Sequence, residues 1–210
     1  MSLSVNTLNL GMMGTNCYIL YDENNNAAVI DPEVYNGSLE KAIRGLGITE
    51  LKYILLTHGH FDHIGGVKEL REKFGGKIVI HEEDEKCFVD ETYSLTSFFS
   101  QNTEYPEKAD ITVKDGDILP FGNREIEVIH TPGHTEGGVC YKTDNLIFSG
   151  DTLFENSIGR SDFPGGNPLV LLKSVRKLVS RDGSFYVLPG HGGSTKLEKE
   201  RKTNPFLQNG

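Results

Sequence analysis

Side chains that can bind metal ions follow short apolar runs at several places in this chain. The sequence THGHFDHIGG, at residues 57–66, places four of them directly after the apolar run YILL: His58, His60, Asp62 and His63. Three more each follow another apolar run: His134, Asp151 and His191. Loops at the carboxyl ends of strands are where α/β folds gather functional groups. The strongest constraint on the fold is therefore that it must bring these loops together.

The spacing within residues 57–66 indicates two binding points rather than one. His58 and His60 are two residues apart, so they point the same way in extended backbone. Asp62 and His63 come after the chain turns into a helix, and they can face a second point. His134 and His191 can complete one group each, and the two oxygens of Asp151 can bridge the groups: this gives the candidate set His58, His60, Asp62, His63, His134, Asp151 and His191. Imidazole and carboxylate ligands without sulfur suit two divalent ions, with zinc favoured over iron or manganese.

Two further histidines do not join this pattern. His81 follows the run KIVI and precedes the acidic run EEDE, and His130 precedes the turn TPGH. An isolated histidine is more often structural or exposed than a metal ligand. We therefore predict structural roles for both, with His130 supporting the turn that carries His134.

Short apolar runs that end in turns alternate with amphipathic stretches along the whole chain. We expect strands at 15–22 and 27–32 (a hairpin), 53–58, 77–81, within 111–133, at 137–151 (a hairpin) and at 184–191. We expect helices at 38–47, with Ser38 as N-cap and Gly47 as stop, and at 64–76, 167–180 and 195–204. Residues 89–110 have the weakest pattern and are expected to form an irregular cap held down by Phe98, Phe99 and Tyr105, with a lid or a partner surface as the alternative. The mixture predicts the α/β class.

Composition narrows the kinds of protein that the chain can be. Its 210 residues suit a single domain, residues 1–210. The net charge of −9 and the lack of a basic run argue against a nucleic-acid partner. No apolar run reaches the ~18 residues of a membrane span, and the amino terminus does not resemble a signal peptide. The cysteines are few and far apart, which favours the reducing cytoplasm: Cys17, Cys87 and Cys140.

These motifs together resemble the metallo-β-lactamase-fold superfamily. THGHFDHIGG, TPGHTEGG, FSGDTLF and LPGHGG match its metal motifs in the right order over nearly the whole chain. The resemblance implies a four-layer αββα sandwich with the metals in a shallow cleft at one edge of the sheets. It also implies that His58, His60 and His134 bind one metal. Asp62, His63 and His191 would bind the other, with Asp151 and a hydroxide as bridges.

Within that superfamily, the sequence GDTLFENSIGRSDFPGGN is most similar to the glyoxalase II group, the hydroxyacylglutathione hydrolases, and KERKTNPFL is similar to its small bacterial members. The resemblance implies a binuclear thioesterase for a small-molecule substrate such as S-lactoylglutathione. Asp62 and Asp151 would be its catalytic carboxylates. For Arg160 and Asp162, in GRSDF, we expect an ion pair, with a purely structural role favoured over one that supports the chemistry. The helical domain with which larger members hold glutathione has no counterpart after His191, so the substrate stays open. The oligomeric state stays open as well.

Several other functions use the same kind of site. A persulfide dioxygenase would hold a single iron at His58, His134 and Asp151, and elemental analysis with oxygen uptake would distinguish it. A hydrolase of another ester or a lactone also fits. A true β-lactamase fits less well, because its zinc enzymes commonly have cysteine in place of Asp151 and lack a histidine at the position of His63. A non-catalytic metal-binding scaffold fits least, since closed structural zinc sites are usually rich in cysteine.

Overall fold

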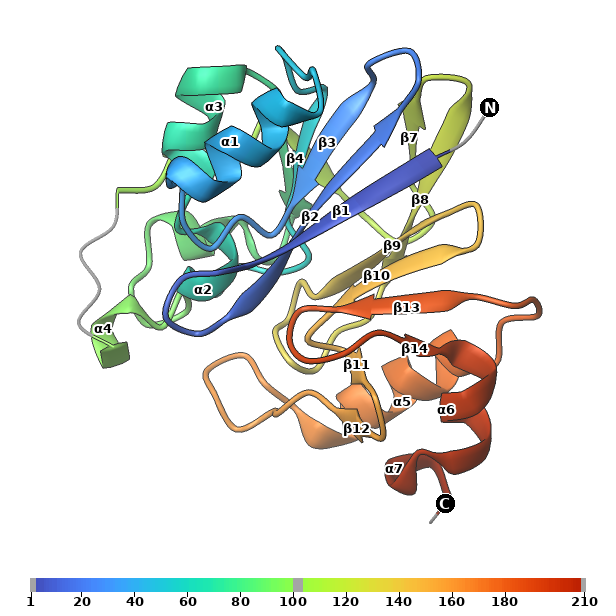
Figure 1. Cartoon of the computed structure of the whole chain (residues 1–210). Helices are drawn as coiled ribbons and strands as arrows, with labels where there is room; N and C mark the ends of the chain where they lie inside the picture. The colour runs from blue at the N-terminus through green and yellow to red at the C-terminus, as the bar shows by residue number, and fades with distance from the viewer. Residues whose placement is uncertain (1–2, 100–103, 209–210) are drawn as a thin grey trace.

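The computed structural model describes residues 3–99 and 104–208, and within them two mixed sheets pack face to face (Figure 1). The first sheet has the order β1 (Leu3–Leu10), β2 (Thr15–Asp22), β3 (Ala27–Ile30), β4 (Tyr53–Leu55), β5 (Lys77–His81) and β6 (Ile111–Val113). The second has the order β14 (Thr195–Lys196), β13 (Tyr186–Pro189), β10 (Leu146–Gly150), β9 (Val139–Thr143), β8 (Arg124–His130) and β7 (Ile118–Phe121). A short hairpin joins β11 (Leu153–Phe154) to β12 (Ser157–Ile158).

Helices cover the outer face of each sheet. α1 (Gly37–Gly45), α2 (Phe61–Ile64) and α3 (Val67–Phe74) lie on the side of the first sheet, and α5 (Pro168–Val179), α6 (Leu197–Thr203) and α7 (Pro205–Gln208) lie on the side of the second (Figure 1). A 3₁₀ turn (Glu85–Phe88) and α4 (Thr96–Phe99) follow β5. The four-layer αββα arrangement that the family resemblance implies is therefore confirmed.

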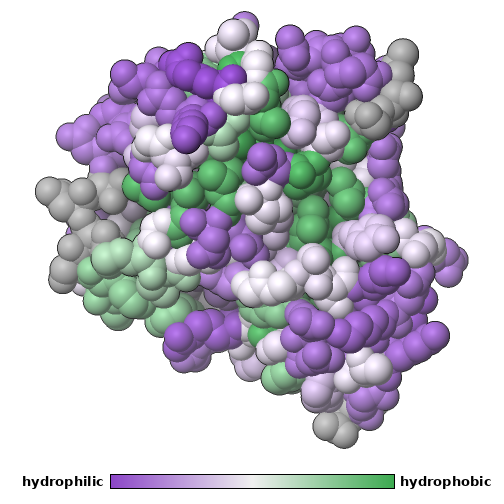
Figure 2. All heavy atoms as spheres, viewed as in Figure 1, coloured by the Kyte–Doolittle hydropathy of each residue, from purple (hydrophilic) through white to green (hydrophobic). Residues whose placement is uncertain are grey.

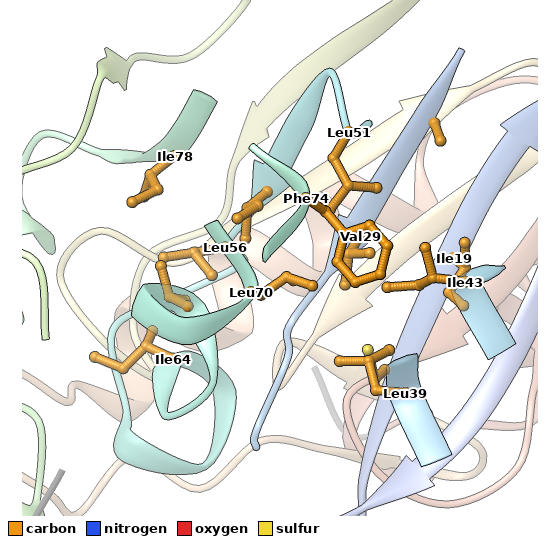
Figure 3. Close-up of a cluster of buried hydrophobic side chains, with 14 of the residues drawn as sticks. Ile19, Val29, Leu39, Ile43, Leu51, Leu56, Ile64, Leu70, Phe74 and Ile78 are labelled. Carbon is orange, nitrogen blue, oxygen red and sulfur yellow. The ribbon is translucent and has the colours of Figure 1, made fainter. Parts of the chain in front are cut away.

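Three hydrophobic clusters hold the four layers together. The first, shown in Figure 3, packs α1 and α3 onto the first sheet through side chains such as Leu39, Leu70 and Val29. The second lies between the sheets, and the third joins the second sheet to α5. Each fully buried aliphatic side chain contributes about 1.5–3 kcal/mol of transfer free energy. The two sheets are thus fixed to each other, which makes the edge where their loops meet rigid.

Two expectations about helices were wrong in detail. Asn36, not Ser38, is the N-cap of α1, and its side chain accepts hydrogen bonds from the amides of Ser38 and Leu39. The helix expected at 64–76 is α3, which covers only Val67–Phe74; Gly65 and Gly66 separate it from the short helix α2 (Phe61–Ile64). A Cβ on either glycine would lie within 2.5 Å of backbone atoms of residues 33–35, so the close approach of that segment requires glycine here.

The weakly patterned stretch 89–110 differs from its expectation. Tyr105 does pack against the first hydrophobic cluster, but Phe98 of α4 is 59% exposed, and Phe99 is 40% exposed although its ring lies 5.0 Å from that of Phe61. Residues 100–103 of this stretch lie outside the described part of the chain. The hydropathy-coloured surface shows pale green side chains gathered over α4 and the neighbouring β1–β2 turn (Figure 2).

Two other features bear on the general class of the protein. Cys17, Cys87 and Cys140 are all buried and free. Within residues 3–99 and 104–208, no helix combines the length and the apolar composition that crossing a membrane requires.

Candidate metal centre

Three imidazole rings meet at the edge of the two sheets. His134 Nε2 lies 3.2 Å from His58 Nε2 and 3.0 Å from His60 Nδ1, and all three side chains are buried. His58 follows β4, His60 caps the start of α2, and His134 follows β8. Nitrogen atoms from two sheets thus converge on one point, which is the arrangement of a three-histidine cation site.

A second group lies beside the first. Asp62 Oδ2 is 3.3 Å from His191 Nε2 and 3.7 Å from His63 Nε2. Asp62 and His63 belong to α2, and His191 follows β13. These three side chains form a further group whose ligand atoms lie within 4.8 Å of one another.

Asp151 stands between the two groups, directly after β10. Its Oδ2 lies 3.6 Å from His134 Nε2 and 3.7 Å from His191 Nε2, while its Oδ1 lies 3.5 Å from His63 Nε2. The structure therefore brings together all the candidate ligands predicted from the sequence, with Asp151 in the position that a bridging carboxylate needs.

The polar atoms at the centre fit bound cations. Among the described residues, His63 Nε2 and Asp151 Oδ1 are buried and have no hydrogen-bond partner. A buried polar atom without a partner costs about 1–3 kcal/mol, so native proteins satisfy almost all of them. A divalent cation between these atoms would accept a lone pair from each. The residues present therefore fit the metal ions that their pattern predicts.

Contacts behind the imidazoles fix their orientation. His134 Nδ1 donates to the carbonyl of Arg160 at 2.7 Å, and Asp31 Oδ2 lies 3.0 Å from His63 Nδ1. Asp31 also accepts hydrogen bonds from the amide and the hydroxyl of Thr57 at 2.8 and 2.7 Å. The hydrogen bond at His134 Nδ1 and the ion-pair contact at His63 Nδ1 occupy one nitrogen of each ring, which leaves His134 Nε2 and His63 Nε2 directed into the centre.

Asp84 ties the two histidine-bearing loops together. Its buried carboxylate accepts from the amide of Gly59 at 3.0 Å, the amide of Gly137 at 2.7 Å and the hydroxyl of Thr135 at 2.7 Å. The sequence analysis missed Asp31 and Asp84. Asp31 had a usable signal, because it follows an apolar strand just as Asp151 does. Asp84 had none, because it lies in an ordinary acidic run.

Gly190 leaves the space that the side chains of Asp151 and His63 occupy. A Cβ on Gly190 would lie 2.3 Å from Asp151 Oδ1 and 2.7 Å from His63 Cε1. Any other residue here would displace both side chains. The motif LPGHGG therefore needs its first glycine for space beside the ligands.

Burial and charge set the protonation states at the centre. Burial, followed by the neighbouring histidines, lowers the pKa of His58 and His60 well below the ordinary value, which keeps both rings neutral. Burial would also lower the pKa of His63, but Asp31, Asp62 and Asp151 outweigh it and raise this pKa to about 10. Burial opposes ionisation of Asp62, yet His63 and the other histidines hold its pKa well below the usual range. The ionised carboxylates thus stabilise a positive charge beside them. When no metal is bound, the proton on His63 provides that charge.

His81 and His130 take the structural roles predicted for them. Their rings stack with centroids 4.0 Å apart and an angle of 13° between planes. His81 Nδ1 accepts from the amide of Glu83, and His130 Nε2 donates to the carbonyl of Glu136 in the loop that carries His134. Neither belongs to a group of metal-capable side chains within the described residues.

A model of the Metallo-beta-lactamase superfamily matches residues 10–191. The chain is a member of this superfamily. It is 35% identical to the hydroxyacylglutathione hydrolase GloC of Haemophilus influenzae, over 91% of this chain and 92% of that protein.

Two solved structures of this superfamily are also similar to the chain. The BLEG-1 B3 metallo-beta-lactamase is 32% identical, with a TM-score of 0.92 over 98% of this chain and 100% of that one. TTHA1623 in a di-iron-bound form is 32% identical, with a TM-score of 0.84 over 97% of this chain and 100% of that one. The superfamily, its fold and a general role as a metal-dependent hydrolase follow from these matches.

Proposed function

We propose that this chain is a two-metal hydrolase that acts on thioesters of the hydroxyacylglutathione type. The observation that carries the proposal is the pair of ligand groups, three histidines on one side and Asp62, His63 and His191 on the other, with Asp151 between them. The similarity to GloC over almost the full length of both chains supports the thioester. The di-iron form of TTHA1623 supports two metals rather than one.

The metal ligands define what the bound ions would supply. When bound, two divalent cations at these groups would lower the pKa of a water molecule to about 7 and polarise the substrate carbonyl. Zinc suits imidazole and carboxylate ligands, and iron or manganese also fits them. Asp62 and Asp151 carry two negative charges, so two divalent cations leave the centre positive. A positive centre stabilises the negative charge that develops on the carbonyl oxygen.

The chain's own residues then have defined tasks in the hydrolysis. Asp62 holds its carboxylate, in the ionised form, beside the position of the attacking water and accepts a hydrogen bond from it. Water adds to the carbonyl carbon, the carbon–sulfur bond breaks, and the products are a carboxylate and a thiol. A thiolate leaves readily because a thiol has a pKa of about 8.5, so no separate general acid is needed.

β-Lactam hydrolysis is the second candidate, because the similarity to BLEG-1 is as extensive as any reported above. The persulfide dioxygenase alternative requires one iron at His58, His134 and Asp151. All three reactions can be compared on one preparation. The substrates are S-lactoylglutathione, a chromogenic cephalosporin, and glutathione persulfide with an oxygen electrode.

The deciding experiment compares His58→Ala with the matched control His81→Ala. Both residues are buried histidines at the carboxyl ends of strands of the first sheet, His58 after β4 and His81 as the last residue of β5, but only His58 lies in the centre. We expect the metal-loaded wild type and His81→Ala to hydrolyse the thioester and His58→Ala to lose activity by at least ~100-fold. Equal rates in the two variants would reject the centre. Turnover of only the cephalosporin or the persulfide would reject the thioester.

A further inference from the structure

The cavity above the metal centre has a polar floor and apolar walls. Its volume is about 340 Å³, near the lower end of small-molecule sites. The floor consists of the ligands His60, Asp62, His134, Asp151 and His191. The walls are formed by Met13, Phe61, Leu95, Phe99, Phe154 and Phe163. Such a cavity has room for a compact group and offers it mainly aromatic and thioether contacts.

Met13 is held over the cavity by a buried carboxylate. Glu33 accepts hydrogen bonds from the amides of Met13 at 3.0 Å and Thr15 at 3.1 Å, through its two different oxygens. Gly11 begins this β1–β2 turn with φ +63°, and a Cβ there would lie 2.0 Å from the carboxyl carbon of Glu33. The turn is therefore built around Glu33. It places Met13, which is 44% exposed, on the cavity wall, whereas Met12 is 84% exposed and does not line the cavity.

Phe163 and Arg160 form another side of the cavity. The ring of Phe163 meets the ring of His60 edge to face, with centroids 6.1 Å apart. The Arg160 guanidinium lies 3.9 Å from the centroid of Phe163 and donates two hydrogen bonds of 2.7 Å to Asp162, which confirms the predicted ion pair. Among the described residues that line the cavity, Arg160 is the only lysine or arginine, and Asp162 already compensates its charge.

We propose that the preferred acyl group of the thioester carries an apolar, preferably aromatic, substituent; this inference rests on the function proposed above. The substrate carbonyl must sit over the floor, with the acyl group on one side of it and the thiol on the other. A glutathione thiol carries charged groups, so its favourable direction is toward solvent. The acyl group then lies inside the cavity, among the apolar side chains of its walls, which include Met13. A large apolar acyl group buries more of the apolar cavity wall than the methyl group of a lactoyl thioester does.

A matched pair of substrates tests this preference. S-mandeloylglutathione and S-lactoylglutathione share the thiol and the α-hydroxyl group and differ in phenyl against methyl. We expect kcat/KM to be at least ~10-fold higher for the mandeloyl thioester, because each added apolar carbon in a fitting pocket is worth ~10-fold or more. Met13→Ala should lower this ratio by about 3-fold or more. Met12→Ala, one residue away on the solvent side, should leave it unchanged.

Product binding separates this inference from the function on which it rests. Calorimetry with the metal-loaded protein should show tighter binding of mandelate than of lactate, and Met13→Ala should reduce the difference while Met12→Ala should not. If the enzyme hydrolyses both thioesters with equal efficiency, or if the two methionine variants behave alike, the apolar preference is wrong and the thioesterase stands. If neither thioester is hydrolysed, the thioesterase is wrong, and the mandelate–lactate difference still decides the character of the cavity.

Discussion

The five histidines of the centre and the stacked pair His81–His130 show what distinguishes ligands from structural histidines. His58 and His81 are both buried and both stand at the carboxyl ends of neighbouring strands. Backbone groups contact a ring nitrogen of both His81 and His130. His134 has a backbone contact at Nδ1 as well, but the histidines of the centre also direct a nitrogen toward one another and toward two carboxylates. Burial and position after a strand are therefore insufficient, and the convergence of lone pairs on acidic groups makes the difference.

The largest expected effect comes from removing the carboxylate that stands between the two ligand groups. Asp151→Ala should reduce metal affinity by more than the ~10–100-fold that loss of a supporting contact costs, because a ligand is lost outright. Metal content after dialysis and the rate of thioester hydrolysis both measure it. The same measurements on His130→Ala should match the wild type. Full metal content in Asp151→Ala would contradict the distinction between the metal centre and the structural pair His81–His130.

A smaller effect on metal affinity is expected from a substitution at Asp31, which contacts the ligand His63. Asp31→Asn weakens the contact that orients His63 and should lower metal affinity by about 10–100-fold, measured by competition with a chelator. Asp22→Asn is the matched control, since Asp22 is also a buried acceptor at the end of a strand of the first sheet. Both variants should lose stability, but only Asp31→Asn should lose metal. Equal metal affinity in the two variants would contradict a positioning role for Asp31.

The stacked pair His81–His130 should affect how protein stability depends on pH, and it should not affect metal binding. Burial, together with His130, lowers the pKa of His81 to about 4, below its unfolded value of about 6.5. Above pH 6.5 both states are neutral, and the group has no effect on stability. As the pH falls from about 6.5 toward 4, His81 becomes protonated in the unfolded state but stays neutral in the folded state. The free energy of unfolding therefore decreases over this range.

His81→Gln removes this titration. Between pH 6.5 and 4, the free energy of unfolding of the metal-loaded variant should fall by about 2 kcal/mol less than that of the wild type. Denaturant titrations across this range measure the difference. Parallel pH profiles for the two proteins would show that His81 does not titrate as a buried neutral ring.

The smallest effect is expected at the outer member of the pair. His130→Phe keeps an aromatic ring for stacking but loses the hydrogen bond to the carbonyl of Glu136, which should cost about 1 kcal/mol of stability. Metal affinity should stay within about 2-fold of the wild type, because His134 remains held by the carbonyl of Arg160. A large loss of metal from His130→Phe would show that the stacked pair His81–His130 contributes to the metal centre.

The sequence was sufficient for features that depend on neighbouring residues, and insufficient for those set by distant ones. The ligands after strands follow from local pattern, whereas the layer order came from the family resemblance that the motifs carry. Asp31 contacts residues 26 positions away, and Asp84 reaches residues 25 to 53 positions away. Those partners become visible only once the sheets are packed. Phe98 was expected to pack down because it is apolar, but it is exposed, whereas Phe99 finds a partner in Phe61 of α2, which the sequence does not reveal.

Crystallography of metal-loaded protein, with anomalous diffraction and elemental analysis, tests the central claim most directly. The account predicts two ions per chain, about 3.5–4 Å apart. One would contact His58, His60 and His134, the other Asp62, His63 and His191, and Asp151 would contact both. A single ion, ions bound elsewhere, or an intact centre that takes up no metal would contradict it.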